Sequence, residues 1–181
     1  MIDITNIRDY KKIILLGSGG SGKSYMSKHI AQITGYPLYH LDNEFWKQDW
    51  VMSTKEEKLK RHEEIFSEET WIIDGNYNST MEIRFAAADL IIFLDINRIV
   101  CILSAARRAG KKRSDLPDYL TEHKWFNKEF LQFAKWQWDY PKTDKPKVVA
   151  LREKYHEKAF LHIKNRREVK EFIKKWGHND A

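Results

Sequence analysis

Short apolar runs alternate along the chain with longer segments in which apolar and charged residues recur at helical spacing. The runs are rich in Ile, Leu and Phe and are bounded by polar or turn-forming residues, which is typical of buried strands. They lie at residues 12–16, 37–41, 70–74, 89–95 and 159–164. The segments between them predict helices over 53–69, 97–109, 118–140 and 165–176. Three more helices are expected, of which one ends at Thr34, one begins at Ser79 and one ends at about Lys158. Strands separated by helices predict a parallel sheet with helices on both faces.

Several residues mark where these helices begin and end. Gly35 is placed to stop the first helix, and Ser53 followed by Glu56 fits a capping box that opens the next one. Pro141 is expected to close the helix over 118–140, because proline does not continue a helical hydrogen-bond pattern.

The stretch between the fourth and fifth predicted strands contains no strand of its own. We therefore expect a helical insertion or lid over about 107–158. The remaining segments, about 1–106 and 159–176, would form the core of a single domain, as a length of 181 residues suggests.

A phosphate-binding motif follows the first predicted strand. The sequence GSGGSGKS from Gly17 to Ser24 is a complete Walker A loop between a strand and a helix, a context that disfavours a mere glycine-rich turn. Backbone N–H groups of such a loop surround phosphate oxygens, Lys23 reaches the β- and γ-phosphates, and Ser24 binds Mg²⁺. We expect ATP to be held by Gly17, Ser18, Gly19, Gly20, Ser21, Gly22, Lys23, Ser24 and Tyr25.

Three aspartates each end a predicted strand. Asp74 has the form of a Walker B carboxylate and would hold Mg²⁺ directly or through water, with capping of the following turn as the alternative. Asp42 would lie at the sheet rim facing the phosphates, where it would accept a proton from an attacking hydroxyl or orient the acceptor, unless it only shapes a turn. We assign Asp95 to helix capping, by itself or through Asn97.

Phosphoryl transfer to an acceptor other than water requires additional positive charge and the exclusion of water. Arg84 is a candidate for holding an anionic acceptor. The further candidate cations are Arg107, Arg108, Lys111, Lys112 and Arg113. Of these, we expect Arg108 and Arg113 to act in catalysis and Arg107 to bind the nucleotide. A solvated basic surface is the alternative for each, but their place in a strandless insertion favours a lid.

Composition and charge narrow the class of protein. A hydrophobic share of 42%, one cysteine and the lack of a membrane-length apolar run predict a globular cytoplasmic protein without disulfides. Residues 1–97 carry a net charge of −4 and residues 98–175 one of +11. This division suits an anionic ligand, which is a nucleotide with its metal, a nucleic acid or an anionic surface.

Seven aromatic residues fall within residues 125–140. The spacing of Phe126, Phe130 and Phe133 predicts core packing, and stacking on bases of single-stranded nucleic acid is the alternative. Cys101, among apolar residues of a predicted helix, is expected to be a core residue rather than a nucleophile. The seven histidines are scattered and predict no metal site.

The order of these motifs resembles the adenylate-kinase-like P-loop kinases, and within them the DNA topology modulation proteins of the FlaR type. The likeness is carried by LDNEFWKQDW from Leu41, IIDGNY from Ile72, LDINRIVC from Leu94 and QWDYPKTDKPKV from Gln137. It implies a three-layer P-loop NTPase fold with a five-stranded parallel sheet, an acceptor region after the second strand and a mobile lid after the fourth.

One position departs from the pattern of these kinases. Relatives often carry an arginine where this chain has Ser104, and that arginine stacks on adenine and touches the phosphates. Arg107 and Arg108, one turn further on, are the candidates to replace it.

The function favoured by the sequence is that of an ATP- and Mg²⁺-dependent kinase acting on a small molecule with a hydroxyl or phosphate acceptor. The alternatives are a nucleic-acid-associated regulator of DNA topology and a simple NTPase. The net charge of +6 favours nucleic acid, but a phosphate-binding enzyme explains it equally, so we expect weak, non-specific nucleic acid binding at most. We expect no membrane association, and a monomer or homodimer; the motifs do not identify the acceptor.

Overall fold

The computed structural model describes residues 4–48, 51–109 and 128–177. These residues form a five-stranded parallel sheet with the strand order β2-β3-β1-β4-β5. The strands are β1 (Lys12–Gly17), β2 (Leu38–His40), β3 (Trp71–Asp74), β4 (Leu90–Leu94) and β5 (Ala159–Ile163). The α-helices are α1 (Lys23–Thr34), α2 (Leu41–Phe45), α3 (Lys55–Phe66), α4 (Met81–Ala87), α5 (Arg98–Arg108), α6 (Lys128–Thr143), α7 (Lys145–Lys154) and α8 (Arg166–Gly177), and short 3-10 turns are η1 (Ile7–Asp9) and η3 (Asn78–Thr80).

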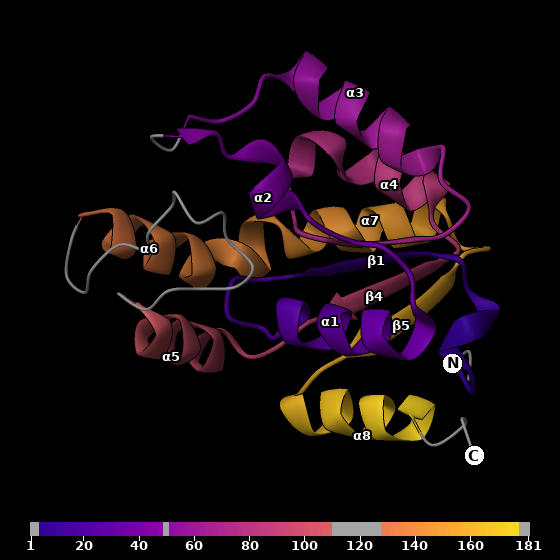
Figure 1. Ribbon diagram of the computed structural model, residues 1–181. Helices are drawn as coiled ribbons and strands as arrows, with labels where there is room; N and C mark the ends of the chain where they lie inside the picture. The colour runs from indigo at the N-terminus through magenta and orange to yellow at the C-terminus, as the bar shows by residue number, and fades with distance from the viewer. Residues whose placement is uncertain (1–3, 49–50, 110–127, 178–181) are drawn as a thin grey trace.

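Helices cover both faces of the sheet, with α1 and α8 on one side and α3, α4 and α7 on the other (Figure 1). The alternation of side chains along β1 explains the two layers. Ile13 and Leu15 pack toward α1 and α8, whereas Ile14 and Leu16 pack toward α3, α4 and α7. The three-layer α/β architecture predicted from the sequence is thereby confirmed.

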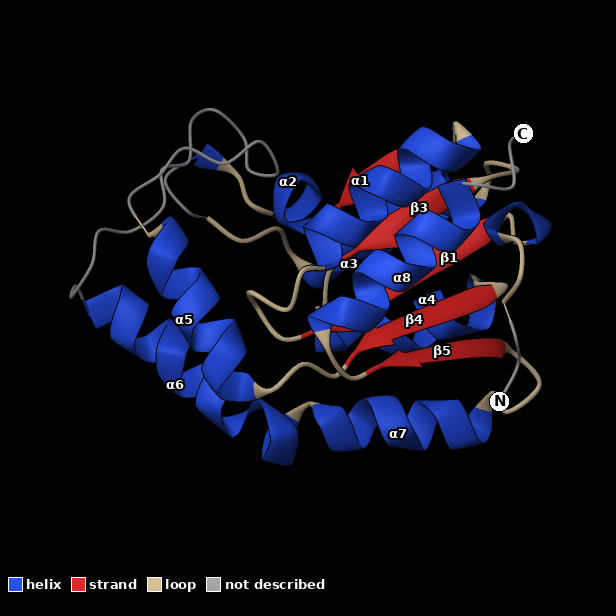
Figure 2. Cartoon of the chain, turned by 90° about the horizontal axis from the view of Figure 1, so that it is seen from below, coloured by secondary structure: helices blue, strands red, loops and turns tan. Residues whose placement is uncertain are grey.

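The predicted insertion over 107–158 has two different parts in the described residues. Its last helix, α7, packs on the sheet through the fully buried Val148 and so belongs to the outer layer. The helices α5 and α6 lie instead beyond the carboxyl ends of the strands, together with α2 (Figure 2). Residues 110–127, which carry most of the predicted lid cations, lie outside the described residues.

The capping box before α3 lies one residue later than predicted. Thr54 accepts a hydrogen bond from the Glu57 N–H (3.2 Å), and the Glu57 carboxylate accepts one from the Thr54 N–H (2.8 Å). Ser53 does not cap, because its N–H donates to the Phe45 carbonyl (2.8 Å) and holds the preceding loop.

Two further boundaries differ from the prediction. The helix expected to close at Pro141 continues to Thr143, because the Asp144 N–H donates to the Tyr140 carbonyl (3.0 Å) and extends the helical pattern past the proline. The strand expected over 37–41 ends at His40, where the chain turns into α2.

Helix α5 begins after Asn97, which is one of the two residues predicted to cap it. The Asn97 side chain accepts a hydrogen bond from the Ile99 N–H (2.9 Å). Asp95 is therefore not the cap. It pairs with Lys145 (2.6 Å) and His162 (2.9 Å), which joins α7 to the end of β5.

Helix α3 covers α2 through a buried histidine. His62 packs against Phe45 and Phe66, its Nδ1 donates to the Lys58 carbonyl (2.7 Å), and its Nε2 has no hydrogen-bond partner among the described residues. Burial lowers the pKa of His62 to about 4. The imidazole is thus neutral in the folded protein, whereas an unfolded histidine titrates near pH 6.5.

This histidine should make stability dependent on pH. Its folded pKa lies below the unfolded one, so full stability is present above about pH 6.5 and declines as the pH falls toward 4, by about 2–3 kcal/mol. Urea unfolding at several pH values measures the decline. His62→Phe should flatten this part of the curve, whereas the exposed His156→Gln should leave it unchanged. A parallel decline in both variants would assign it to other groups.

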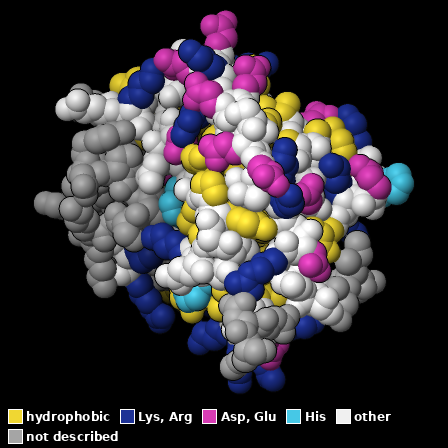
Figure 3. Space-filling model, turned by 45° about the vertical axis from the view of Figure 1, so that its right-hand side comes forward, with side chains coloured by type: hydrophobic (Ala, Val, Ile, Leu, Met, Phe, Trp, Pro, Cys, Tyr) yellow, Lys and Arg dark blue, Asp and Glu magenta, His cyan; other side chains and the backbone are white. Residues whose placement is uncertain are grey.

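The surface charges reflect the division seen along the chain. On the face shown in Figure 3, most Asp and Glu side chains lie on the upper part, with Lys and Arg among them, and Lys and Arg predominate on the lower part. No helix in the described part of the chain is both long and apolar enough to cross a lipid bilayer.

Candidate active site

A cleft of about 1040 Å³ opens at the carboxyl ends of the central strands. Its walls come from the loop between β1 and α1, the ends of β2 and β3, and helices α2, α5, α6 and α8. Of the predicted nucleotide-binding residues, those that line it are Gly19, Gly20, Gly22, Lys23, Ser24 and Tyr25. The predicted Asp42, Asp74 and Arg108 line it as well, so the fold brings these distant segments together.

The loop from Gly17 to Gly22 has the backbone of a phosphate cradle. Gly20 has a φ of 72°, and a Cβ atom there would collide with the Cys101 carbonyl, so the position requires glycine. A Cβ atom at Gly22 would meet no other atom within 4 Å, so the space beside it is open. The Ser18 and Ser21 hydroxyls are buried without a hydrogen-bond partner among the described residues.

Lys23 opens α1 and points back over the loop. Its ammonium donates to the carbonyls of Gly17 (2.8 Å) and Ser18 (3.1 Å). Burial lowers the pKa of Lys23, and the nearby carboxylates of Asp74 and Asp42 act against that shift. A buried ammonium held by carbonyls of its own loop is positioned to exchange them for phosphate oxygens.

The loop after β3 is fastened to the phosphate cradle. The Asn76 side chain accepts from the Gly17 N–H (3.0 Å) and donates to the Gly17 carbonyl (2.7 Å), so a single amide satisfies both backbone groups. The sequence did not predict this contact, because it joins two segments that lie 59 residues apart.

Arg84 has a different place from the one predicted for an acceptor ligand. It is fully buried outside the cleft lining, and its guanidinium donates to the carbonyls of Gly75 (2.7 Å), Tyr77 (3.0 Å), Thr80 (3.3 Å) and Asn76. Burial lowers its pKa to about 9. The cation therefore shapes the β3–α4 loop from behind, because it saturates carbonyls that would otherwise be buried without partners.

Loss of the Arg84 guanidinium should mainly lower the stability of the fold. Arg84→Met would leave several buried carbonyls unpaired, so we expect the free energy of unfolding to fall by at least about 3 kcal/mol. Urea denaturation measures this, with the exposed Arg152→Met as control. If Arg84→Met kept its stability but bound the acceptor more weakly, Arg84 would be an acceptor ligand as the sequence predicted.

A histidine and a carboxylate pair at the base of the cleft. Asp74, at the end of β3, is 5% exposed, and its Oδ2 accepts a hydrogen bond from Nδ1 of His40 (3.0 Å), which ends the neighbouring strand β2. Both side chains line the cleft. The parallel register places His40 beside Asp74 and explains the contact, which the sequence analysis missed.

Asp42 lies in the first turn of α2, two residues after β2, and remains at the sheet rim as predicted. Its Oδ1 accepts a hydrogen bond from the Tyr77 hydroxyl (2.8 Å), and Tyr77 in turn hydrogen-bonds the side chain of Trp46. Burial and the Asp42 carboxylate raise the pKa of Tyr77, so the phenol stays protonated. Tyr77 has a φ of 28°, which is uncommon for a residue other than glycine.

The cations of the cleft gather near Ser104. Arg108 lies one turn after Ser104 on α5 and lines the cleft, whereas Arg107 is exposed and outside the cleft lining. Arg166, which the sequence analysis did not single out, donates from the first turn of α8 to the Gly20 carbonyl (3.0 Å) and to the Ser104 hydroxyl. Arg113 lies outside the described residues.

Helix α6 closes over the phosphate cradle. Gln137 donates to the Gly19 carbonyl (2.7 Å), and the ring of Phe133 lies where a Cβ atom at Gly19 would be. Phe133, expected in the core, lines the cleft and is 37% exposed. Cys101 is buried as expected, and burial raises its pKa.

The donor set fits a nucleotide with Mg²⁺. The open cradle, the buried hydroxyls of Ser18 and Ser21 and the ammonium of Lys23 suit phosphate oxygens. A hydroxyl at Ser24 and a carboxylate at Asp74, both in the cleft lining, are hard oxygen ligands of the type that Mg²⁺ prefers beside phosphates.

No protein-family model and no curated protein matches this sequence. Solved structures share its fold. A shikimate kinase from Acinetobacter baumannii in complex with shikimate has a TM-score of 0.58 at 14% identity over 97% of both chains. A gluconokinase from Sinorhizobium meliloti 1021 has a TM-score of 0.52 at 14% identity over 93% of this chain and 90% of that one. A deoxyadenosine kinase from M. mycoides with bound dATP has a TM-score of 0.53 at 17% identity over 90% and 95%.

At these identities the likeness establishes the fold. The sheet, its flanking helices and the loop before α1 form a three-layer P-loop NTPase fold, as the sequence predicted.

Proposed function

We propose that this chain is an ATP-dependent kinase that transfers the γ-phosphoryl group to a hydroxyl of a small molecule. The observation that carries the proposal is the single cleft that joins the Walker A loop to a carboxylate at Asp42. The structural similarity to kinases that are named for shikimate, gluconate and deoxyadenosine supports it through the fold.

Each group has a role that follows from its position. Lys23 and the loop N–H groups would bind the β- and γ-phosphates, and Arg108 and Arg166 would balance their charge. Ser24 and Asp74 would hold Mg²⁺, which supplies neutralising charge when bound. Arg113 remains a predicted lid cation.

Asp42 is positioned to act as the general base. A carboxylate beside the phosphate cradle accepts the proton of an acceptor hydroxyl as its oxygen attacks the γ-phosphorus. The Tyr77 hydroxyl donates to Oδ1 of Asp42 and so orients the carboxylate within the cleft.

Acceptor-dependent ATP consumption tests the proposal. ADP formation should rise at least about tenfold over the rate in water when a panel of nucleosides, sugars and hydroxy acids contains the acceptor class. If ADP forms at a rate typical of enzyme turnover and no compound in the panel raises that rate, the result would favour the simple NTPase.

The relation to DNA topology modulation proteins stays a prediction, as does a regulator that binds nucleic acid. Binding driven by the basic half should be weak and should fall steeply as salt is raised from about 50 to 200 mM, because bound cations are released from the phosphates. Tight duplex binding that persists at the higher salt would favour the regulator.

A further inference from the structure

Aromatic side chains line the cleft, two of them beside Asp42 and two on α6. The Tyr77 hydroxyl donates to Asp42, and the Trp46 indole N–H donates to the Tyr77 oxygen, so two of these rings are fixed next to the carboxylate. Helix α6 supplies two more, because Phe133 and Trp136 stack with a centroid separation of 5.6 Å and an interplanar angle of 29°. All four side chains line the same cleft.

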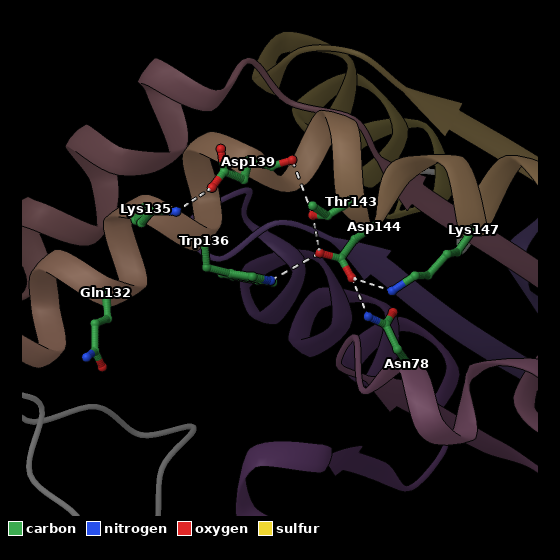
Figure 4. A pocket seen from close by; sticks show the side chains of 8 residues that line it. All are labelled: Asn78, Gln132, Lys135, Trp136, Asp139, Thr143, Asp144 and Lys147. Atoms are coloured by element: carbon green, nitrogen blue, oxygen red, sulfur yellow. Dashed lines mark hydrogen bonds and ion pairs between the residues drawn. The ribbon is translucent and has the colours of Figure 1, made fainter.

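The indole of Trp136 is anchored from behind. Its Nε1 donates to the Asp144 carboxylate (3.1 Å), which also accepts from Thr143 (2.9 Å) and Asn78 (Figure 4). Asp144 is 4% exposed, so the carboxylate at the centre of this network is buried at the junction of α6 and α7. A ring held in this way can stack on a ligand with little loss of side-chain freedom.

A second cavity, of about 420 Å³, borders Trp136 on the side of Asp144. It shares Gln132 and Trp136 with the large cleft, so both spaces border these side chains. The Gln132 amide both donates and accepts hydrogen bonds, as does the edge of a heteroaromatic base.

The cations and the carboxylates of the cleft lie on different elements. Among the described residues, Lys23 and Arg166 contact carbonyls of the phosphate cradle, and Arg108 lies nearby on α5. The charged lining residues on α2 and α6 are the carboxylates of Asp42 and Glu129. An anionic acceptor beside α2 and α6 would meet like charge, whereas a neutral one with a planar ring would stack.

One cation lies close to Tyr77 without lining the cleft. The Lys58 ammonium sits 5.5 Å from the ring centroid of Tyr77 and 5.6 Å from that of Phe45. It is 9% exposed and is not part of the cleft lining, so it supports the Tyr77 ring from the side of α3.

We infer that the acceptor is a neutral nucleoside, whose base is planar and heteroaromatic and whose sugar carries the reacting hydroxyl. This inference rests on the proposed kinase function. The base of the nucleoside stacks on Trp136 and Phe133, and its sugar hydroxyl lies at Asp42. The hydroxyl oxygen forms a bond to the γ-phosphorus, the bond from that phosphorus to the β–γ bridging oxygen breaks, and the proton passes to Asp42. The products are ADP and a nucleoside monophosphate.

Competition between acceptor classes tests the inference. With ATP labelled on its γ-phosphate, neutral nucleosides should be phosphorylated with a kcat/KM at least about tenfold above those of shikimate, gluconate and nucleoside monophosphates. Preference for a carboxylate or a phosphorylated acceptor would overturn the inference and leave the kinase function standing. Absence of any labelled product that depends on Lys23 would overturn the kinase function itself.

Variants of the stacking ring give the second test. Trp136→Leu should raise the KM for the nucleoside at least about tenfold, with the KM for ATP within about twofold, because the proposed stacking partner of the ring is the nucleoside base. Trp136→Phe should restore most of the affinity. The control is Trp138→Leu on the same helix, whose ring is 48% exposed and stacks on Arg98 outside the cleft. An unchanged nucleoside KM in Trp136→Leu would contradict the inference.

Discussion

Lys23→Ala should lower phosphoryl transfer by at least about 10²-fold while leaving the protein folded. The ammonium is the cation that the Walker A loop itself provides, and it already lies on the carbonyls of Gly17 and Ser18. Burial lowers the pKa of Lys23, so its charged form gains little from the folded state, and its removal should shift the thermal midpoint only slightly. Initial rates at saturating ATP measure the loss.

A lysine on the same helix provides the matched control. Lys28 lies on α1 beyond the cleft lining, and Lys28→Ala should keep turnover within about twofold of the parent protein. If Lys23→Ala turned over ATP at the parent rate, the assignment of the phosphate-binding loop would be wrong.

Asp42→Asn should lower kcat by about 10²–10⁴-fold and change the KM for ATP little. The amide keeps an oxygen for the hydrogen bond from Tyr77 but does not accept the acceptor's proton. Stopped-time assays at saturating ATP and acceptor separate kcat from KM.

Two further substitutions distinguish the base from its surroundings. Tyr77→Phe removes the hydroxyl that orients Asp42 and should cost less than Asp42→Asn. Glu82→Gln, at an exposed carboxylate that pairs with Lys154 on the outer surface, should have no effect. Equal activity of Asp42→Asn and the parent protein would show that another group takes the proton.

The sequence predicted best what depends on local pattern. The runs of β1, β3 and β4 are apolar and short, and the motif from Gly17 to Ser24 specifies a strand, a turn and a helix on its own. The parallel sheet and the rim position of Asp42 follow from the strand–helix alternation. These features need no knowledge of distant contacts.

The features that the sequence missed depend on contacts between distant segments. Arg166 reaches Ser104 and Gly20, which lie 62 and 146 residues away along the chain. His40 and Asp74 meet only because β2 and β3 pair in register. Arg84 looked like a cleft cation, but the tertiary structure turns it onto backbone carbonyls, and a charge pattern contains no signal for that choice.

The hydrophobic pattern also could not predict on which surface α6 packs. Helical spacing predicted that Phe133 is buried, but spacing does not tell whether the covered face packs on a core or on a cleft. Gln137 and Phe133 pack on Gly19, so the helix belongs to the site. Only the position of Gly19 in the folded chain reveals this.

The fate of the γ-phosphoryl group tests the central claim most directly. The protein is incubated with Mg²⁺, ATP labelled on the γ-phosphate and the acceptor panel, with Lys23→Ala in parallel, and the labelled products are separated. The kinase account predicts that the label appears in a phosphate ester of one acceptor, in the parent protein and not in Lys23→Ala. Label that appears only as inorganic phosphate, whatever acceptor is present, would contradict it.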